Sequence, residues 1–217
     1  MVDGIIYIAG HARKINCFPE NFGTPAVMAY AYDQNPMVSA VLPDDETSAY
    51  QMTRYLIRKG HKKIALLAGR EDNLHTRRRL KGYQNALFDA QILYNPRLVR
   101  YVDWNKPSGY QETKRLLKED ITAIFCMADT IAGGVYQYLD EQGLRAGRDV
   151  SVVGFDNHVL SEYMIPGLTT MALPLKEIGT TSAKLLFDQI EKGEVEMNRE
   201  ILIPCFLVER CSVKEIK

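Results

Sequence analysis

Short apolar runs rich in β-branched residues alternate with amphipathic stretches along almost the whole chain. Strands are predicted at residues 5–9, 26–31, 64–68, 98–102, 121–127 and 150–155, with further extended runs at 168–173 and 201–208. Helices are predicted at residues 45–59, around 80–90, and at 108–118, 130–142 and 176–192. This alternation is typical of βαβ units, so we expect an α/β fold in which helices flank parallel sheets.

The predicted helices carry the spacing of one buried face. The first begins at Asp45, a predicted N-cap, and stops at Gly60, where a left-handed residue is favoured. Its inward positions are Ala49, Met52 and Leu56. The inward positions of the last helix are Ile178, Leu185 and Ile190. Each helix therefore offers an apolar stripe to a sheet.

Composition narrows the class of protein. The 217 residues are 46% hydrophobic and 25% charged, which excludes disordered and low-complexity chains. The formal net charge is zero, so no global field favours DNA, RNA or an anionic membrane. The four cysteines lack zinc or redox spacing, and no signal peptide or long apolar run is visible. We therefore expect a cytoplasmic protein with reduced thiols.

Candidate binding residues follow the predicted strands, because ligands of open parallel sheets sit outside the carboxyl ends of the strands. The set that we single out is Tyr30, Arg79, Trp104, Asp129, Phe155 and Asp156. Aromatic rings stack on sugar C–H faces, while carboxylates and guanidinium groups bind neighbouring hydroxyls, so the set suits a polyol. Any one of these residues taken alone is more often an exposed loop side chain. Arg77, Arg78 and Arg79 point in different directions on a helix, and Arg79 is best placed to turn inward.

Catalytic motifs are absent from the sequence. It contains no phosphate-binding loop, no HExxH and no GxSxG, and its four histidines are scattered. Carboxylates are numerous, but no pair suited to glycoside hydrolysis stands out. We therefore expect no catalytic residues, no metal and no cofactor, and predict a binding protein rather than an enzyme.

Several blocks together resemble the effector-binding part of lactose-repressor (LacI/GalR-type) transcription regulators. In order along the chain they are 2–6 (VDGII), 60–69 (GHKKIALLAG), 79–83 (RLKGY), 122–126 (TAIFC), 150–157 (VSVVGFDN) and 166–170 (PGLTT). The block 150–157 with the following LTT is the most specific. The resemblance covers essentially the whole chain.

The resemblance implies a periplasmic-binding-protein-like fold of two subdomains joined by three crossovers, near residues 42–45, 171–174 and 202–205. The N-terminal subdomain would comprise 1–43 plus 173–203, and the C-terminal subdomain 44–172 plus 204–217. The expected ligand is a small effector, a sugar or sugar derivative, bound in the cleft between them.

Family roles carry over residue by residue. The resemblance makes Arg79 the effector-clamping arginine, Asp156 the cleft aspartate, Trp104 a cleft aromatic and Asp129 the acidic member of an Asn-Asp pair. Ala128 stands where many relatives carry the Asn of that pair. A homodimer is implied, with operator DNA bound only through an N-terminal helix-turn-helix domain that precedes this region in relatives.

A solute-binding protein of a sugar transport system is the alternative. Such a protein carries a secretion signal, and the cysteines favour the cytosol, so a regulator is the preferred interpretation. An upstream helix-turn-helix would distinguish the regulator, and a signal peptide the transporter.

Relatives also place a strand, a helix, a strand and a helix before the VDGII strand, whereas here VDG follows Met1 directly. The first subdomain is therefore expected to be incomplete. Ile5, Ile6, Val27 and the inner face of 176–192 would then lack cover, and we expect either a dimer that covers this face or disorder in residues 10–25.

Overall fold

The computed structural model describes residues 2–9, 14–19, 21–193, 197 and 199–216. The chain divides into two compact units. Unit 1 comprises Met1–Asp44 and Pro174–Cys205, and unit 2 comprises Asp45–Leu173 and Phe206–Lys217. The chain therefore passes from one unit to the other three times.

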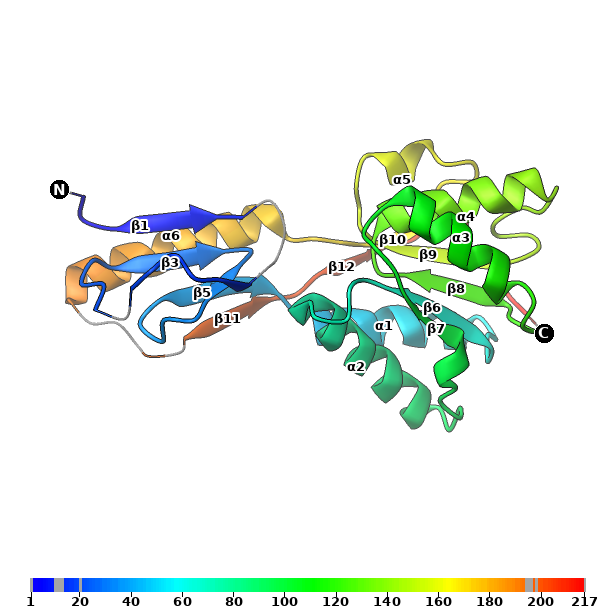
Figure 1. Ribbon diagram of the computed structural model, residues 1–217, viewed down its shortest axis with the longest axis horizontal. Coiled ribbons are helices and arrows are strands. Elements are labelled where there is room, and N and C mark those ends of the chain that lie inside the picture. Colours follow the sequence, from blue (N-terminus) through cyan, green and yellow to red (C-terminus); the bar gives the residue numbers. More distant parts are fainter. Residues whose placement is uncertain (1, 10–13, 20, 194–196, 198, 217) are drawn as a thin grey trace. The chain divides into compact units, whose positions relative to one another are not determined.

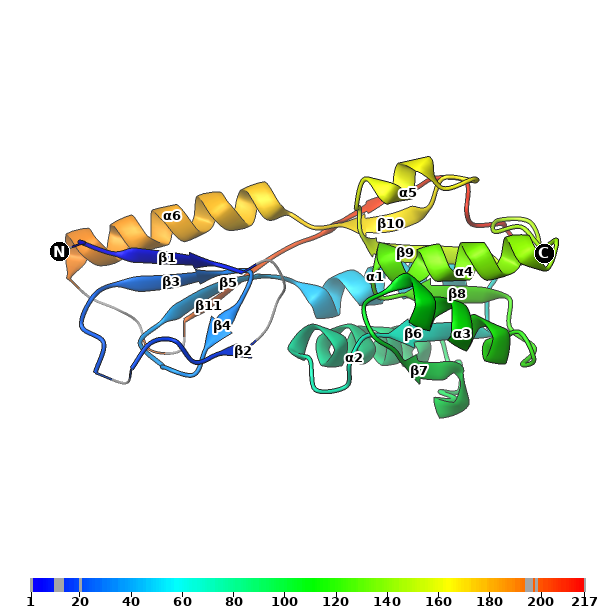
Figure 2. The same cartoon turned by 45° about the horizontal axis from the view of Figure 1, so that its top comes forward.

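Unit 1 is built on a parallel sheet with one long helix on a face. The sheet has the order β1 (Ile5–Ile8), β3 (Ala26–Ala29), β5 (Ser39–Pro43) and β11 (Glu200–Ile203). Helix α6 (Leu175–Lys192) packs on β1, β3 and β5. A small parallel pair, β2 (Lys14–Ile15) and β4 (Tyr32–Asp33), completes the unit; in Figure 2, α6 lies above the sheet and this pair below it.

The core of unit 1 joins the sheet to α6. Val27 is fully buried and packs in one cluster with Ile178 and Leu185, so the expectation that Val27 lacks cover is wrong. Ile5 and Ile6 are partly buried. Ile190, predicted to face inward, is 37% exposed, because the helix contacts the sheet mainly along the stripe of the other two residues.

The segment 10–25, where disorder is one of the two expected alternatives, is only partly open to comparison. Residues 10–13 and 20 lie outside the described residues. In the described remainder, β2 pairs with β4 and Phe18 is 8% exposed.

Unit 2 is a doubly wound sheet. Its strand order is β12 (Phe206–Val208), β10 (Thr169–Ala172), β9 (Ser151–Asp156), β8 (Ala123–Cys126), β6 (Ile64–Ala68) and β7 (Val99–Tyr101). All pairings are parallel except that of β12 with β10. The helices are α1 (Asp45–Arg58), α2 (Leu74–Asp89), α3 (Lys106–Leu116), α4 (Asp129–Glu141) and the short α5 (Leu160–Tyr163), with a 3₁₀ turn at Pro96–Leu98.

In unit 2, α1 packs on α2 and α3 packs on α4, and these two pairs cover opposite faces of the sheet (Figure 1). All five residues of β6 and all four of β8 are buried, as expected for strands covered on both sides. Ala65, Leu67 and Ile124 pack with Ile131 and Val135 of α4. The α/β fold of parallel sheets flanked by helices is therefore confirmed.

Two strand predictions need correction. The run 201–208, predicted as one interrupted strand, forms β11 in unit 1 and β12 in unit 2. Pro204 lies between them and lacks the N–H that would continue either ladder. Strand β5 was not predicted, although all five of its residues are buried.

Candidate functional site

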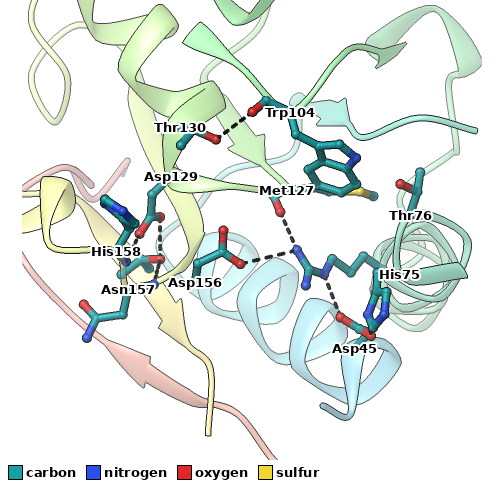
Figure 3. A network of polar contacts seen from close by, with 12 residues as sticks. Asp45, His75, Thr76, Trp104, Met127, Asp129, Thr130, Asp156, Asn157 and His158 are labelled. Atoms are coloured by element: carbon teal, nitrogen blue, oxygen red, sulfur yellow. Dashed lines mark hydrogen bonds and ion pairs between the residues drawn. The ribbon is translucent and has the colours of Figure 1, made fainter. Parts of the chain in front are cut away.

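Side chains from four elements of unit 2 meet at the carboxyl ends of β6, β8 and β9 (Figure 3). Arg79 of α2 is at the centre. Around it lie Asp45 of α1, the Met127 carbonyl after β8, and Phe155 and Asp156 of β9. The edge that binds ligands in open α/β sheets thus carries a guanidinium and two carboxylates.

Asp45 is brought to Arg79 by a close crossing of α1 and α2. A Cβ placed on Gly82 would lie 2.1 Å from the Glu46 carbonyl oxygen, so only glycine allows this approach. Asp45 is the first helical residue of α1 and is fully buried, which corrects its prediction as an N-cap. Its carboxylate turns inward to His75 and Arg79 of α2.

The Asp45 carboxylate binds two basic side chains. One oxygen accepts the Arg79 Nε–H at 2.7 Å, and the other contacts Nδ1 of His75. Burial acts to raise the pKa of Asp45, but the Arg79 charge and the His75 hydrogen bond outweigh it and hold that pKa below its ordinary value. Asp45 therefore remains ionised and balances the charge of Arg79.

Arg79 itself is only 2% exposed. Its guanidinium lies 3.6 Å from the centroid of the Phe155 ring and donates from Nη1 to the Met127 carbonyl oxygen. Phe155 is fully buried beneath it. Both residues were predicted to bind ligand; the structure places Phe155 as a support for Arg79.

Asp156 is the more open acidic group of the site. One carboxylate oxygen lies 3.9 Å from Nη1 of Arg79, and the side chain is 29% exposed. Burial raises the pKa of Asp156 to about 7, with Arg79 acting in the opposite direction. At neutral pH this group is therefore available both as an acceptor and as a donor to a polar ligand.

Asp129, the first residue of α4, is fully buried. One oxygen accepts the Thr170 hydroxyl at 2.7 Å, and the other accepts the His158 backbone N–H at 2.8 Å. Burial raises its pKa to about 7, although both hydrogen bonds oppose that change. Asp129 thus joins α4 to β10 and to the loop that follows β9.

Trp104 closes the site from the loop after β7. A Cβ on Gly69 would lie 1.9 Å from its ring, so the indole rests directly on the Gly69 backbone. Thr130 donates its hydroxyl to the Trp104 carbonyl oxygen at 3.2 Å. The partly buried ring packs on the core of unit 2 and faces the region of His75 and Thr76 (Figure 3).

Tyr30 belongs to unit 1 and follows β3. It is partly buried, has a left-handed φ of 61°, and donates its backbone N–H to the Val41 carbonyl oxygen at 3.0 Å. Its part in ligand binding stays a prediction.

Asp45, His75 and the Met127 carbonyl were missed by sequence reasoning. Asp45 follows β5, so the rule that found the other candidates would have included it had that strand been predicted. Backbone carbonyls carry no residue-type signal at all.

Two other kinds of feature, a metal-ligand cluster and a membrane-spanning helix, are absent from the described residues. Across 2–9, 14–19, 21–193, 197 and 199–216, no group of three His, Cys, Asp or Glu side chains is placed to hold a metal ion. Within the same ranges, no helix combines the length and apolar character needed to span a membrane.

Known proteins are similar to this chain in sequence and in fold. The family model described as "Periplasmic binding protein-like domain" matches residues 53–213. The ribose operon repressor of Haemophilus influenzae is 31% identical over 218 residues, covering 100% of this chain and 65% of that protein. This chain thus spans slightly less than two thirds of the length of that relative.

Solved structures give the same result. A LacI family transcriptional regulator from Enterococcus faecium with bound ribose has a TM-score of 0.77 and 33% identity, covering 91% of this chain and 73% of that one. The transcriptional regulator CelR in complex with cellobiose has a TM-score of 0.83 and 30% identity, covering 97% and 66%. The sequence and fold comparisons therefore agree, and this chain belongs to the periplasmic binding protein-like family, among the LacI-type transcription regulators.

Proposed function

We propose that this chain is the effector-sensing part of a LacI-type transcription regulator and binds a sugar or sugar derivative through Arg79, Asp156 and Trp104. One observation carries the proposal: the partly exposed Asp156 carboxylate lies beside the buried guanidinium of Arg79, at the carboxyl ends of the strands of a parallel sheet. Relatives named as repressors align along this whole chain, which supports a regulator rather than a transport protein.

The ligand is proposed to be uncharged. Asp45 already balances the charge of Arg79, and Asp156 stands next to the same guanidinium. An anionic ligand would be repelled by the Asp156 carboxylate and would find the Arg79 guanidinium already paired. The hydroxyl groups of a neutral sugar instead bind carboxylates, and its C–H face stacks on an indole. Ribose and cellobiose are the molecules bound in the two structures named above.

DNA is proposed to be bound by a helix-turn-helix domain that accompanies this region in the regulator. This chain has a formal net charge of zero, so its overall charge does not favour DNA binding. We assign it no catalytic role, and we place the regulator in the cytoplasm.

A homodimer is proposed to form through an apolar patch on unit 2, made of Val159, Leu160, Tyr163 and Ile165. These side chains are 62%, 39%, 76% and 93% exposed, although they lie within seven residues of one another in sequence. Leu160, Tyr163 and Ile165 also line a hollow of about 970 Å³ together with Tyr136 and Met164. A clustered apolar surface of this kind marks a protein interface.

Calorimetry tests the binding function. Titrating neutral sugars, sugar phosphates and nucleobases into the protein should identify a neutral sugar that binds. Asp156→Asn and Arg79→Lys should each weaken that sugar about 10- to 100-fold, because a charge-assisted hydrogen bond is lost. Asp140→Asn, at an exposed carboxylate of α4, is the matched control. Unchanged affinity in both site variants would overturn the assignment.

A further inference from the structure

We propose that Arg210 is a positioning residue for Asp156: its guanidinium holds Asn157, the next residue, and so fixes the backbone from which the Asp156 carboxylate projects. This role rests on the proposed function of Asp156 in ligand binding. Arg210 lies two residues after β12 and 54 residues beyond Asp156 in sequence, so nothing local in the chain joins them.

The backbone at Asp156 needs outside support. Asp156 has a φ of 111° and Asn157 a φ of 54°, so two successive residues with side chains adopt left-handed conformations. Such conformations cost free energy and persist only where surrounding contacts determine them. Strand β9 ends at Asp156, so the sheet ladder does not provide those contacts for Asn157.

Arg210 provides the first support. Its Nη2 donates to Oδ1 of Asn157 at 2.9 Å, while Nη1 donates to the Leu168 carbonyl oxygen at 2.7 Å and to the Ser161 hydroxyl at 3.2 Å. The guanidinium is thereby fixed on α5 and the start of β10. A planar fork with several donors makes these contacts together, which a lysine ammonium on a flexible stem cannot reproduce.

The Arg210 side chain is itself well anchored. Its backbone N–H donates to the Thr169 hydroxyl at 2.9 Å, and the side chain is 17% exposed. A Cβ on Gly167 would lie 3.1 Å from its Cδ, so the stem packs on the Gly167 backbone. Its Nη2 lies 3.4 Å from the Glu162 carboxylate at the surface. The guanidinium therefore has one position available to it.

Asp129 provides the second support, one residue further along. It accepts the His158 N–H at 2.8 Å and the Thr170 hydroxyl at 2.7 Å, and that same hydroxyl oxygen lies 3.4 Å from the Asn157 nitrogen. Residues 157 and 158 are thus held from two directions. With the Leu173 N–H donating to the Asp156 carbonyl oxygen at 3.3 Å, the carboxylate has a fixed starting point beside Arg79.

The test is an NMR titration of the side-chain carboxyl carbons in protein labelled at aspartate. Arg210→Lys keeps the positive charge near Asp129 but removes the fork, so the 156–158 backbone should relax and bring the Asp156 carboxylate into water. Its pKa should then fall from about 7 toward the ordinary value of 3.8, a tenfold or larger change in the acid dissociation constant.

A second variant keeps the test decisive if Arg210→Lys folds poorly. Asn157→Gly removes the oxygen that accepts from Arg210 and, at 3.4 Å, from the Ser161 hydroxyl, and it tolerates the left-handed φ. It should therefore produce the same change in the Asp156 titration while the other Arg210 contacts remain. Arg115→Lys, at an exposed arginine paired with Glu112, is the control and should leave the titration unchanged.

A purely structural role for Arg210 predicts something different. Both variants would then lower the unfolding midpoint, while Asp156 in the folded protein would still titrate near 7, and that result would overturn the proposal. The titration needs no ligand, so its outcome is independent of the calorimetry that tests the proposed function.

Discussion

Arg79 donates its Nε–H to the Asp45 carboxylate across 2.7 Å, and neither side chain exposes more than 2% of its surface. Asp45 is the first residue of α1, and Arg79 lies within α2. The two helices cross closely at Gly82. Because this pair is out of contact with water, its charges depend on each other. The same pair sets the position of the guanidinium that faces Asp156.

Removing the charge of Asp45 should therefore be costly. Asp45→Asn leaves the Arg79 guanidinium buried without its counter-charge, and we expect a loss of about 3–5 kcal/mol in the free energy of unfolding, measured in urea. Glu46→Gln, at the neighbouring, partly exposed pair with Lys81, should cost less than about 1 kcal/mol. Equal losses in the two variants would contradict this account of the pair.

The stability of unit 2 should fall as the pH rises from about 4 to 7. Burial raises the pKa of Asp129 and of Asp156 to about 7 from an ordinary value of 3.8, so the folded state binds more protons than the unfolded state in this window. Each carboxylate then contributes a slope of up to about 1.4 kcal/mol per pH unit.

Urea unfolding at pH 5, 6, 7 and 8 measures this dependence. Asp156→Asn should flatten the curve, because the amide does not titrate, and the variant should be more stable than the wild type at pH 8. Asp140→Asn at the surface of α4 serves as the control for loss of a charge. A free energy of unfolding that rises between pH 5 and 7 would show that folding does not raise the pKa values of these two carboxylates.

The position of Trp104 should depend on Gly69. Gly69→Ala places a methyl group where the indole now lies, 1.9 Å from its ring, so the ring must move away from the Gly69 backbone. Trp104 is the sole tryptophan of the chain, so a shift in its emission maximum reports the movement directly. Gly179→Ala, on an open part of α6 with nothing within 4 Å, should leave the emission unchanged. An unshifted spectrum in Gly69→Ala would argue against the described packing.

A phosphate group on the effector should weaken binding. For the neutral sugar found by calorimetry, its phosphate ester should bind at least about tenfold more weakly at pH 8, because Asp156 is then ionised and Asp45 already balances Arg79. The penalty should shrink in Asp156→Asn. A phosphate ester that binds the wild type more tightly than its parent sugar would refute the proposal of an uncharged ligand.

The apolar patch on α5 and the residues after it should control association. Ile165→Asp puts a charge on a side chain that is 93% exposed, so it should cost little stability in the monomer while shifting a dimer toward monomer in sedimentation at equal concentrations. Phe88→Asp, at an 81% exposed side chain of α2, is the matched control. If both variants sediment like the wild type, the dimer uses another surface.

Strands β6 and β8 of unit 2 were predictable because each is a continuous apolar run that is fully buried. Strand β6, IALLA, is the clearest case. Strand β5 was not, because its apolar core of three residues is bounded by Ser39 and Pro43 and follows a segment of turn-forming residues. The short parallel pairing of β2 with β4 depends on contacts that no local pattern encodes.

The candidate site, like the fold, was predictable only where local sequence carries the signal. Arg79, Trp104 and Asp156 follow from the positions where strands end and from the family resemblance. Asp45 pairs with a residue 34 positions away, and its burial follows from the helix crossing at Gly82 rather than from its own neighbours. The support of Asn157 by Arg210 spans 53 positions, beyond what periodicity reveals.

Unit 2 is assembled from two stretches of chain, with α6 and β11 of the other unit made in between. During synthesis, residues 45–173 leave the ribosome before β12 and Arg210 exist. Five of the six strands are then present, but β10 has no partner on its outer edge and Asn157 lacks its contact with Arg210. Asp156, which is proposed to bind the effector, is therefore positioned last. A nascent chain thus forms most of its sheet before its ligand specificity is established.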